Sequence, residues 1–150
     1  MAANYKQGFF HPRNPMKYRG DPTNIVYRSG WEKNVMDWLD TNDNVKSWAS
    51  EEIVIPYVSP IDNRVHMYFV DFYVEALGRD GETKIMLLEV KPAAQTQAPK
   101  TPKRKTKRFI TEVMTYGVNQ AKWDAAQKYC QKKGWEFKIL TEKELFQKNK

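Results

Sequence analysis

Two apolar segments separated by a short turn constrain the fold of this chain more than any other feature. Met67–Glu75 and Lys84–Lys91 are rich in β-branched, aromatic and aliphatic residues, a composition that suits a half-buried pleated surface. Between them lies Gly78-Arg-Asp-Gly81, whose glycines can adopt the positive φ angles of a tight turn. The sequence therefore predicts a β-hairpin.

The predicted hairpin brings two acidic residues together. A turn centred near Arg79-Asp80 places Asp71 and Glu89 at or near opposite positions, and the alternation of side chains then puts both on the same face as Lys91. Like charges opposed at roughly 5 Å destabilise a sheet, so this pair requires a cation. Lys91 is one, and a divalent ion that prefers oxygen ligands, Mg²⁺ or Mn²⁺, is a better one. The residues expected on the opposite face are Val70, Phe72, Leu88 and Val90.

An ordinary hairpin with a solvated, charged face would carry the same residues, and this alternative is open from the strand pattern alone. Asp71, however, lies inside the otherwise apolar run Tyr68–Val74. A polar group is costly in such a place unless it has a purpose. This position favours a functional site.

Length and charge limit the classes of function. With 150 residues the chain is expected to form one domain with a sizeable core, and its net charge of +7 points to nucleic acid, ahead of an acidic protein or membrane surface. The single Cys130 rules out an intramolecular disulfide and fits a reducing compartment. One cysteine and two histidines leave no room for a typical zinc site. No signal peptide, membrane span or phosphate-binding loop is expected.

The segments before the hairpin divide into an arm and a helix. Residues 1–27 are predicted to form an irregular basic and aromatic arm, because prolines interrupt any periodicity, and residues 28–150 a single domain. Ser29 and Glu32 then form the pattern of a capping box at a helix start. Glu32 either only closes that helix or also projects towards the hairpin as a third carboxylate. Glu52–Tyr57 is predicted to be a strand.

A basic loop follows the hairpin. Pro92–Pro102 cannot continue a strand, and the segment around its end is densely cationic. A solvated loop is the ordinary explanation of such a run, yet a loop held by a rigid scaffold beside carboxylates would suit a phosphate backbone. The predicted DNA-binding residues in this loop are Lys100, Lys103, Arg104, Lys105, Lys107 and Arg108.

The remainder predicts a long helix from about Thr106 to Lys132 with Gly134 as its C-terminal cap, a short strand over Trp135–Leu140, and a final helix that begins with a capping box at Thr141. Lys122 is either a surface residue or a further phosphate contact. The apolar stripe of the long helix is expected to be Ile110, Val113, Met114, Gly117 and Ala121.

The order helix, three strands, helix, strand, with Val70-Asp71 and Glu89-Val90-Lys91 in the hairpin, resembles the PD-(D/E)xK nuclease superfamily, although valine replaces the proline that names it. Tyr57, Tyr68 and Phe137–Glu142 are similar to TnsA-type transposon endonucleases, and Arg28–Glu32 is similar to the first helix of phage junction-resolving endonucleases. The arm and the chain length resemble the head-completion proteins of tailed phages.

This resemblance implies an α/β (α+β) fold with a restriction-endonuclease-like core, in which a mixed sheet is flanked by helices. It implies Mg²⁺, with Mn²⁺ as a substitute, held by Asp71, Glu89, the Val90 carbonyl and Glu32. Lys91 would orient or polarise the attacking water, and the metal would lower the pKa of that water. The implied catalytic residues are Glu32, Asp71, Glu89 and Lys91, and Arg28 and Lys122 join the loop residues as DNA contacts.

The implied function is a metal-dependent endonuclease that cuts double-stranded DNA during phage head completion, processes packaged DNA and enables head–tail joining. Its partners would be DNA and the head and neck proteins of the portal vertex, in the host cytoplasm during assembly or in the virion, and a homodimer is open. The alternative is a non-catalytic basic DNA-binding or structural adaptor at the portal vertex. A transposase subunit is disfavoured because the chain is short.

Overall fold

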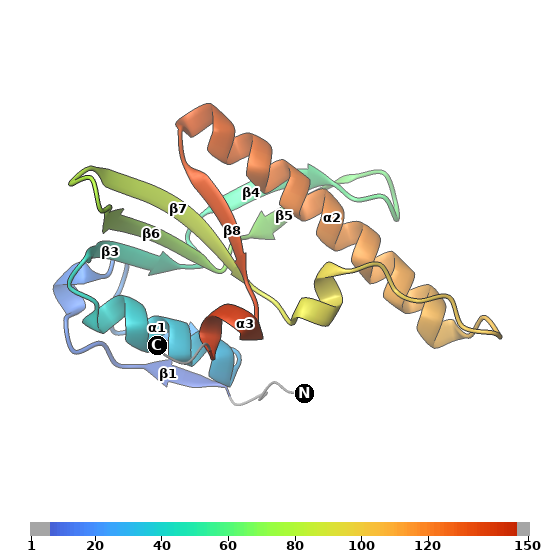
Figure 1. Ribbon diagram of the computed structural model, residues 1–150, viewed down its shortest axis with the longest axis horizontal. Coiled ribbons are helices and arrows are strands. Elements are labelled where there is room, and N and C mark those ends of the chain that lie inside the picture. Colours follow the sequence, from blue (N-terminus) through green and yellow to red (C-terminus); the bar gives the residue numbers. More distant parts are fainter. Residues whose placement is uncertain (1–6, 147–150) are drawn as a thin grey trace.

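The computed structural model describes residues 7–146, and its centre is a four-stranded mixed sheet (Figure 1). Helix α1 (Gly30–Thr41) and the short α3 (Glu142–Leu145) cover one face, while α2 (Lys107–Lys133) covers the other. The predicted fold class, a mixed sheet flanked by helices, is confirmed. In spatial order the strands are β3 (Val45–Ser50), β6 (Phe72–Leu77), β7 (Thr83–Val90) and β8 (Glu136–Leu140), antiparallel except for the parallel pair β7–β8.

The alternation of side chains in β6 and β7 builds a separate core on each face of the sheet. Phe72 and Leu88 pack beneath α1, whereas Tyr73 and Leu87 pack beneath α2. Trp48 of β3, which is completely buried, lies at the centre of the α1 side. The sequence pattern had not indicated β3, because serine and lysine interrupt its apolar residues.

The predicted hairpin is present as β6–β7, and Gly81 takes the left-handed conformation (φ +82°) that its turn requires. The single strand expected over Met67–Glu75 was wrong, however, because it divides into β5 (Val65–Phe69) and β6. Strand β5 pairs with β4 (Val54–Val58) in a separate ladder. At the division Val70 donates its N–H to the carbonyl of Ile53 (3.0 Å) and packs on the α2 side, not with Phe72 as expected.

The N-terminal arm is more regular than the sequence indicated. Its strands β1 (Gly8–Phe10) and β2 (Ile25–Tyr27) pair with each other on either side of a 3-10 turn, η1 (Pro15–Lys17). The buried carboxylate of Asp40 accepts the backbone N–H of Arg13 (2.8 Å), which fastens the arm to α1. The prediction of an irregular arm was therefore wrong for these strands, while residues 1–6 lie outside the described residues, as do residues 147–150 of the predicted domain.

Helix α2 has the predicted ends. The Thr106 hydroxyl accepts the N–H of Phe109 (3.1 Å), and Gly134 closes the helix in the left-handed conformation. The predicted capping box of α3 is also present at Thr141. No helix in the part of the chain described here is long and apolar enough to cross a membrane.

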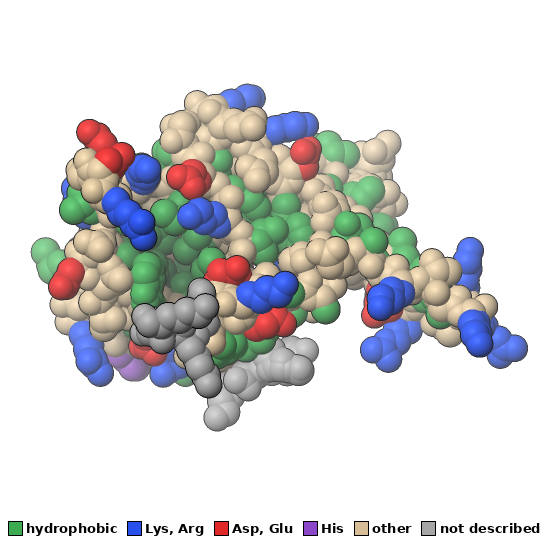
Figure 2. Space-filling view, in the orientation of Figure 1, with side chains coloured by type: hydrophobic (Ala, Val, Ile, Leu, Met, Phe, Trp, Pro, Cys, Tyr) green, Lys and Arg blue, Asp and Glu red, His purple; other side chains and the backbone are tan. Residues whose placement is uncertain are grey.

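The apolar stripe expected on α2 was wrong over its first half. That half projects beyond the sheet together with the loop that follows η2 (Ala93–Thr96), so Ile110, Val113 and Met114 remain exposed (Figure 1). Only the second half packs on the sheet, through Trp123, Ala126 and Cys130. Figure 2 shows lysine and arginine side chains gathered at the projecting end.

Candidate active site

An opening lies at the end of the β6–β7 ladder, where β5 and β6 separate. Successive N–H groups of a strand point to opposite neighbours, and that of Lys91 donates to Leu140 in β8 (2.9 Å). The N–H of Val90 therefore points to the β6 side, where Val70 has already left the ladder. The carboxylate of Asp71 fills the vacant place and accepts the Val90 N–H (2.8 Å). The Val90 carbonyl faces the same opening.

Glu89 stands beside Asp71 because the pairing of Phe72 with Leu88, extended by one residue, sets the two acids opposite each other as the turn position predicted. Glu89 as a whole is 6% exposed. The Tyr68 hydroxyl donates to Oε1 (2.5 Å), and Lys91 Nζ lies 3.5 Å from Oε2. A hydrogen bond and an ion pair thus fix the orientation of Glu89.

Electrostatics reflect the crowding of negative charge. Burial raises the pKa of Asp71 well above its ordinary range, and the charges of Glu89 and Glu32 raise this pKa further. The Val90 N–H and the Lys91 ammonium act in the opposite direction without reversing the shift. Such a perturbed group beside charged partners is typical of functional sites.

Glu32 helps to close the first helix, and its charge also acts on the carboxylates of the hairpin. Its N–H donates to the Ser29 hydroxyl (3.1 Å) and its carboxylate accepts the N–H of Arg28 (3.2 Å), so it helps to close the start of α1. Burial, and then the charges of Glu51 and Glu89, raise the pKa of Glu32, while the Arg28 contacts lower it. The first helix thus presents a carboxylate to the same electrostatic environment as Asp71 and Glu89.

The donor set at the opening fits a hard divalent ion, because carboxylate oxygens and a peptide carbonyl are the ligands that Mg²⁺ and Mn²⁺ prefer. Asp71, Glu89 and the Val90 carbonyl supply these groups, and the mutual repulsion of the two carboxylates favours a cation between them. Across residues 7–146, however, no three His, Cys, Asp or Glu side chains are already gathered as a metal-binding cluster. Glu32 acts on this pair through its charge, which raises the pKa of Asp71.

The sequence did not indicate the roles of two residues of the site. Tyr68 contributed to the family resemblance, but nothing in the sequence indicated that its hydroxyl would hold Glu89. Glu51 adopts the left-handed conformation (φ +55°), donates its N–H to the Asp71 carbonyl (3.1 Å) and pairs with Arg28 (3.2 Å). A glutamate in this conformation is unusual and carries no local sequence signal.

The predicted DNA-binding residues fall into different places. Arg28 is exposed and pairs with Glu51 at the carboxylate site. Lys122 sits over the rings of Tyr57 (5.9 Å) and Tyr68 (5.6 Å), so it adjoins the residue that orients Glu89.

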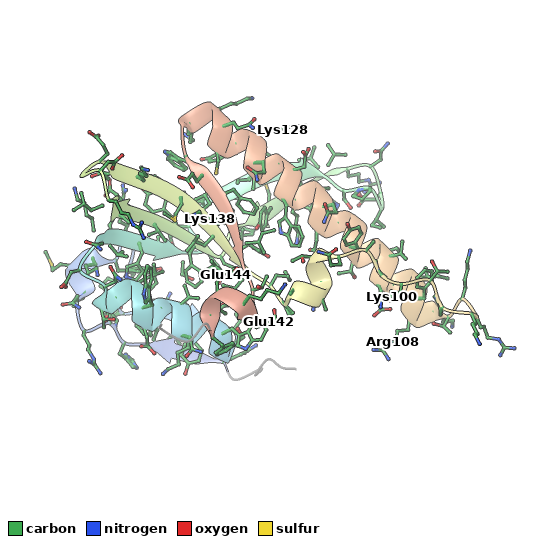
Figure 3. The ribbon with its side chains drawn as sticks, viewed as in Figure 1. Lys100, Arg108, Lys128, Lys138, Glu142 and Glu144 are labelled. Carbon is green, nitrogen blue, oxygen red and sulfur yellow. The ribbon has the colours of Figure 1, made fainter. Side chains whose placement is uncertain are left out.

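The basic loop does not lie beside the carboxylates as expected. Figure 3 places Lys100 and Arg108 at the projecting end of α2, and the sequence neighbours between them are exposed there as well. The physical reason is that η2 and the residues after it run alongside α2, so the chain has left the carboxylates before it reaches Lys100. A hydrogen bond from the Ala93 N–H to Glu142 (2.7 Å) fixes the start of this excursion.

Comparison with known proteins agrees with this geometry. The family model described as "TnsA-like endonuclease N terminal" matches residues 42–142, a range that contains Asp71, Glu89 and Lys91 but not Glu32. The chain is also 42% identical over 139 residues to the Head completion nuclease of Enterobacteria phage T4, covering 90% of each protein. The predicted resemblance to TnsA-type endonucleases and to phage head-completion proteins is confirmed, and the chain belongs to the TnsA-like endonuclease N-terminal family.

Proposed function

We propose that this protein is a metal-dependent DNA endonuclease that acts in phage head completion. The observation that carries the proposal is the convergence of Asp71, Glu89 and Lys91 at the break in the β6–β7 ladder, with the pKa of Asp71 raised by burial and by neighbouring carboxylates. Family membership supports the nuclease activity. The name of the phage T4 relative supports the role in head completion.

Asp71, Glu89 and the Val90 carbonyl would hold the metal, with Glu32 in a more distant supporting position. A bound Mg²⁺ supplies Lewis-acid stabilisation of the phosphate and makes the attacking water more acidic. The other contributions would come from the side chains of the site. Tyr68 keeps Glu89 in its orientation, and Lys91, which already lies beside Glu89, offers the ammonium group that orients the water and balances the negative charge that develops on the phosphate.

Duplex DNA would be held by the exposed cations of the basic loop, which neutralise backbone phosphates without reading sequence. Lys122 is placed to reach a phosphate nearer the carboxylates. In head completion the enzyme would trim or process packaged DNA at the portal vertex before the neck and tail attach. It would meet head and neck proteins there, in the host cytoplasm or as part of the virion. A homodimer would present two such sites to the two DNA strands.

The proposal is tested by incubating the purified protein with supercoiled plasmid and Mg²⁺ or Mn²⁺. The parent is expected to nick the plasmid, whereas Asp71→Asn and Lys91→Met are expected to leave it intact while still binding DNA. Asp37→Asn and Lys33→Met are matched controls, because these residues form an exposed ion pair on α1 (3.8 Å) away from the site. Both controls are expected to nick like the parent.

Two results would overturn the proposal. Binding of DNA by every protein with cleavage by none would leave the adaptor at the portal vertex as the better account. Equal nicking by the parent and by Asp71→Asn would show that the activity comes from another site or from a contaminant.

A further inference from the structure

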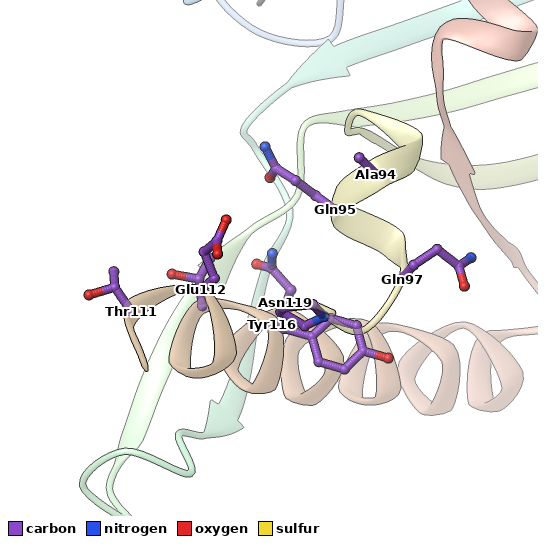
Figure 4. A pocket seen from close by; sticks show the side chains of 9 residues that line it. Ala94, Gln95, Gln97, Thr111, Glu112, Tyr116 and Asn119 are labelled. Carbon is purple, nitrogen blue, oxygen red and sulfur yellow. The ribbon is translucent and has the colours of Figure 1, made fainter. Parts of the chain in front are cut away.

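A pocket of mixed polar and apolar lining separates η2 from the first half of α2 (Figure 4). Its volume of about 260 Å³ is slightly below the range of about 300–1,000 Å³ that accommodates drug-sized ligands, so it suits a ligand as small as a single nucleobase. Side chains from both elements line it, among them Gln95, Gln97, Tyr116 and Asn119.

The lining chemistry indicates what kind of ligand the pocket accepts. Three of these side chains are neutral amides, which offer a donor and an acceptor side by side, and the one charged side chain in the lining is the carboxylate of Glu112. A phosphate would therefore find little compensation here. Amides hydrogen-bond the edges of nucleobases, and an aromatic ring such as that of Tyr116 can stack on a base.

Asn119 brings an amide group to the pocket. The residue as a whole is 5% exposed. In Figure 4 it extends from α2 towards η2, into the pocket. An amide at this place can hydrogen-bond a ligand that offers both a donor and an acceptor.

The pocket adjoins the carboxylate site along the chain from both sides. Helix η2 begins two residues after Lys91. On α2, Asn119 lies one turn before Lys122 and Trp123, and residues three and four apart share a helix face. Lys122 covers the ring of Tyr68, whose hydroxyl holds Glu89. A DNA strand cut at the carboxylates would therefore bring a neighbouring nucleotide to the pocket.

We propose that this pocket receives an unpaired nucleobase next to the scissile phosphate. A base inside a duplex cannot enter it, because stacking and pairing hide its edges. The substrate class is then DNA with an unpaired or displaced nucleotide near the cut, such as a bulge, a branch or a frayed end. The inference rests on the proposed endonuclease function.

The test compares three oligonucleotide substrates that are identical except at one position: a fully paired duplex, a duplex with one unpaired nucleotide, and the same bulge with an abasic residue. The parent is expected to cut the base-containing bulge about tenfold faster than the other two, in line with the contribution of one stacked base. Gln95→Ala and Tyr116→Ala are expected to remove this preference and leave cleavage of the paired duplex unchanged. Gln131→Ala, an exposed glutamine at the far end of α2, is the matched control.

A second readout does not depend on cleavage. With 2-aminopurine as the unpaired base and EDTA present, binding to the parent is expected to change the fluorescence of this base, and binding to Tyr116→Ala is expected not to. Two results would contradict the proposal that the pocket receives a base. One is cutting of the abasic bulge as fast as the base-containing one, and the other is an unchanged preference in both pocket variants. Absence of cleavage from all three substrates would instead contradict the proposed function, and the fluorescence change would still decide whether the pocket holds a base.

Discussion

The two halves of α2 belong to regions with opposite properties. The second half packs through Trp123 and Ala126 on the sheet, close to the buried carboxylates that burial and hydrogen bonds hold in place. The first half projects with exposed apolar residues, and the cations of the loop surround its start. Under the proposed function, the buried site carries out cleavage and the basic loop holds DNA, so a variant should be able to lose one property and keep the other.

The largest effect is expected at the buried site. Glu89→Gln keeps the size of the side chain and the acceptor for Tyr68 but removes the charge that a divalent ion requires. We expect plasmid nicking to fall by at least about 10³-fold, comparable to the loss of an essential electrostatic group in other enzymes. Single-turnover cleavage rates at saturating protein measure this effect. A fall of only a few fold would show that Glu89 is not a metal ligand.

Stability should separate the two halves of the helix itself. Trp123→Ala removes a buried ring and is expected to lower the free energy of unfolding by about 3–5 kcal/mol. Ile110→Ala removes an exposed side chain and is expected to change it by less than about 0.5 kcal/mol. Urea unfolding of both variants measures the contrast. Similar losses would mean that the first half packs against something in the folded protein.

Tyr68→Phe tests how the buried site is oriented. It keeps the ring under Lys122 but removes the hydroxyl that donates to Glu89 (2.5 Å). We expect metal affinity to fall by about 10–100-fold, as for other residues that orient a ligand. Tyr73→Phe is the control, because the Tyr73 hydroxyl accepts a hydrogen bond from Arg19 instead. A Mn²⁺ titration of cleavage distinguishes the two variants. An equal loss of metal affinity in both would show that Tyr68 does not orient a metal ligand.

Variants of the basic loop should change the salt dependence of DNA binding but not the metal dependence of cleavage. Lys103→Ala with Lys105→Ala is expected to reduce the slope of log affinity against log salt by about 2, because each lost phosphate contact accounts for about 0.9. The control pair, Lys128→Ala with Lys138→Ala, lies away from the loop (Figure 3), and both lysines are already paired with acids. Fluorescence anisotropy with duplex DNA measures the slopes. If both pairs give the same slope, the loop is not a DNA contact.

The smallest expected effect is on the pH dependence of the stability of the metal-free protein. Because burial and neighbouring carboxylates raise the pKa of Asp71, the folded protein holds a proton that the unfolded chain releases. This contribution to stability is fully present below the ordinary carboxyl pKa and is lost as the pH rises through the raised value. Asp71→Asn should flatten that loss and Asp37→Asn should not, as measured by urea unfolding in EDTA. An unchanged pH dependence in Asp71→Asn would contradict the pKa shift.

The hairpin that brings the acids together could be predicted because its determinants are local. A glycine-bounded turn and alternating strands set the pairing, and these are visible in Gly78–Gly81 and Lys84–Val90. Helix ends were predictable for the same reason, since a cap such as Thr106 acts on residues three positions away.

Contacts between distant segments could not be predicted in this way. The hydrogen bond from Val70 to Ile53 divides one apparent strand in two, and no residue near Val70 indicates it. The first half of α2 carries an apolar stripe at helical spacing, yet periodicity does not show whether another element is there to cover Ile110 or Met114. The hydroxyl of Tyr68 is a further case, because its partner Glu89 lies 21 residues away.

The central claim is that Asp71 and Glu89 jointly bind a divalent ion, and anomalous diffraction from crystals soaked in Mn²⁺ tests it most directly. The account predicts a Mn²⁺ peak coordinated by both carboxylates, and loss of that peak in Asp71→Asn crystals soaked in the same way. A Mn²⁺ ion bound elsewhere, or the two carboxylates left without one at saturating Mn²⁺, would contradict it.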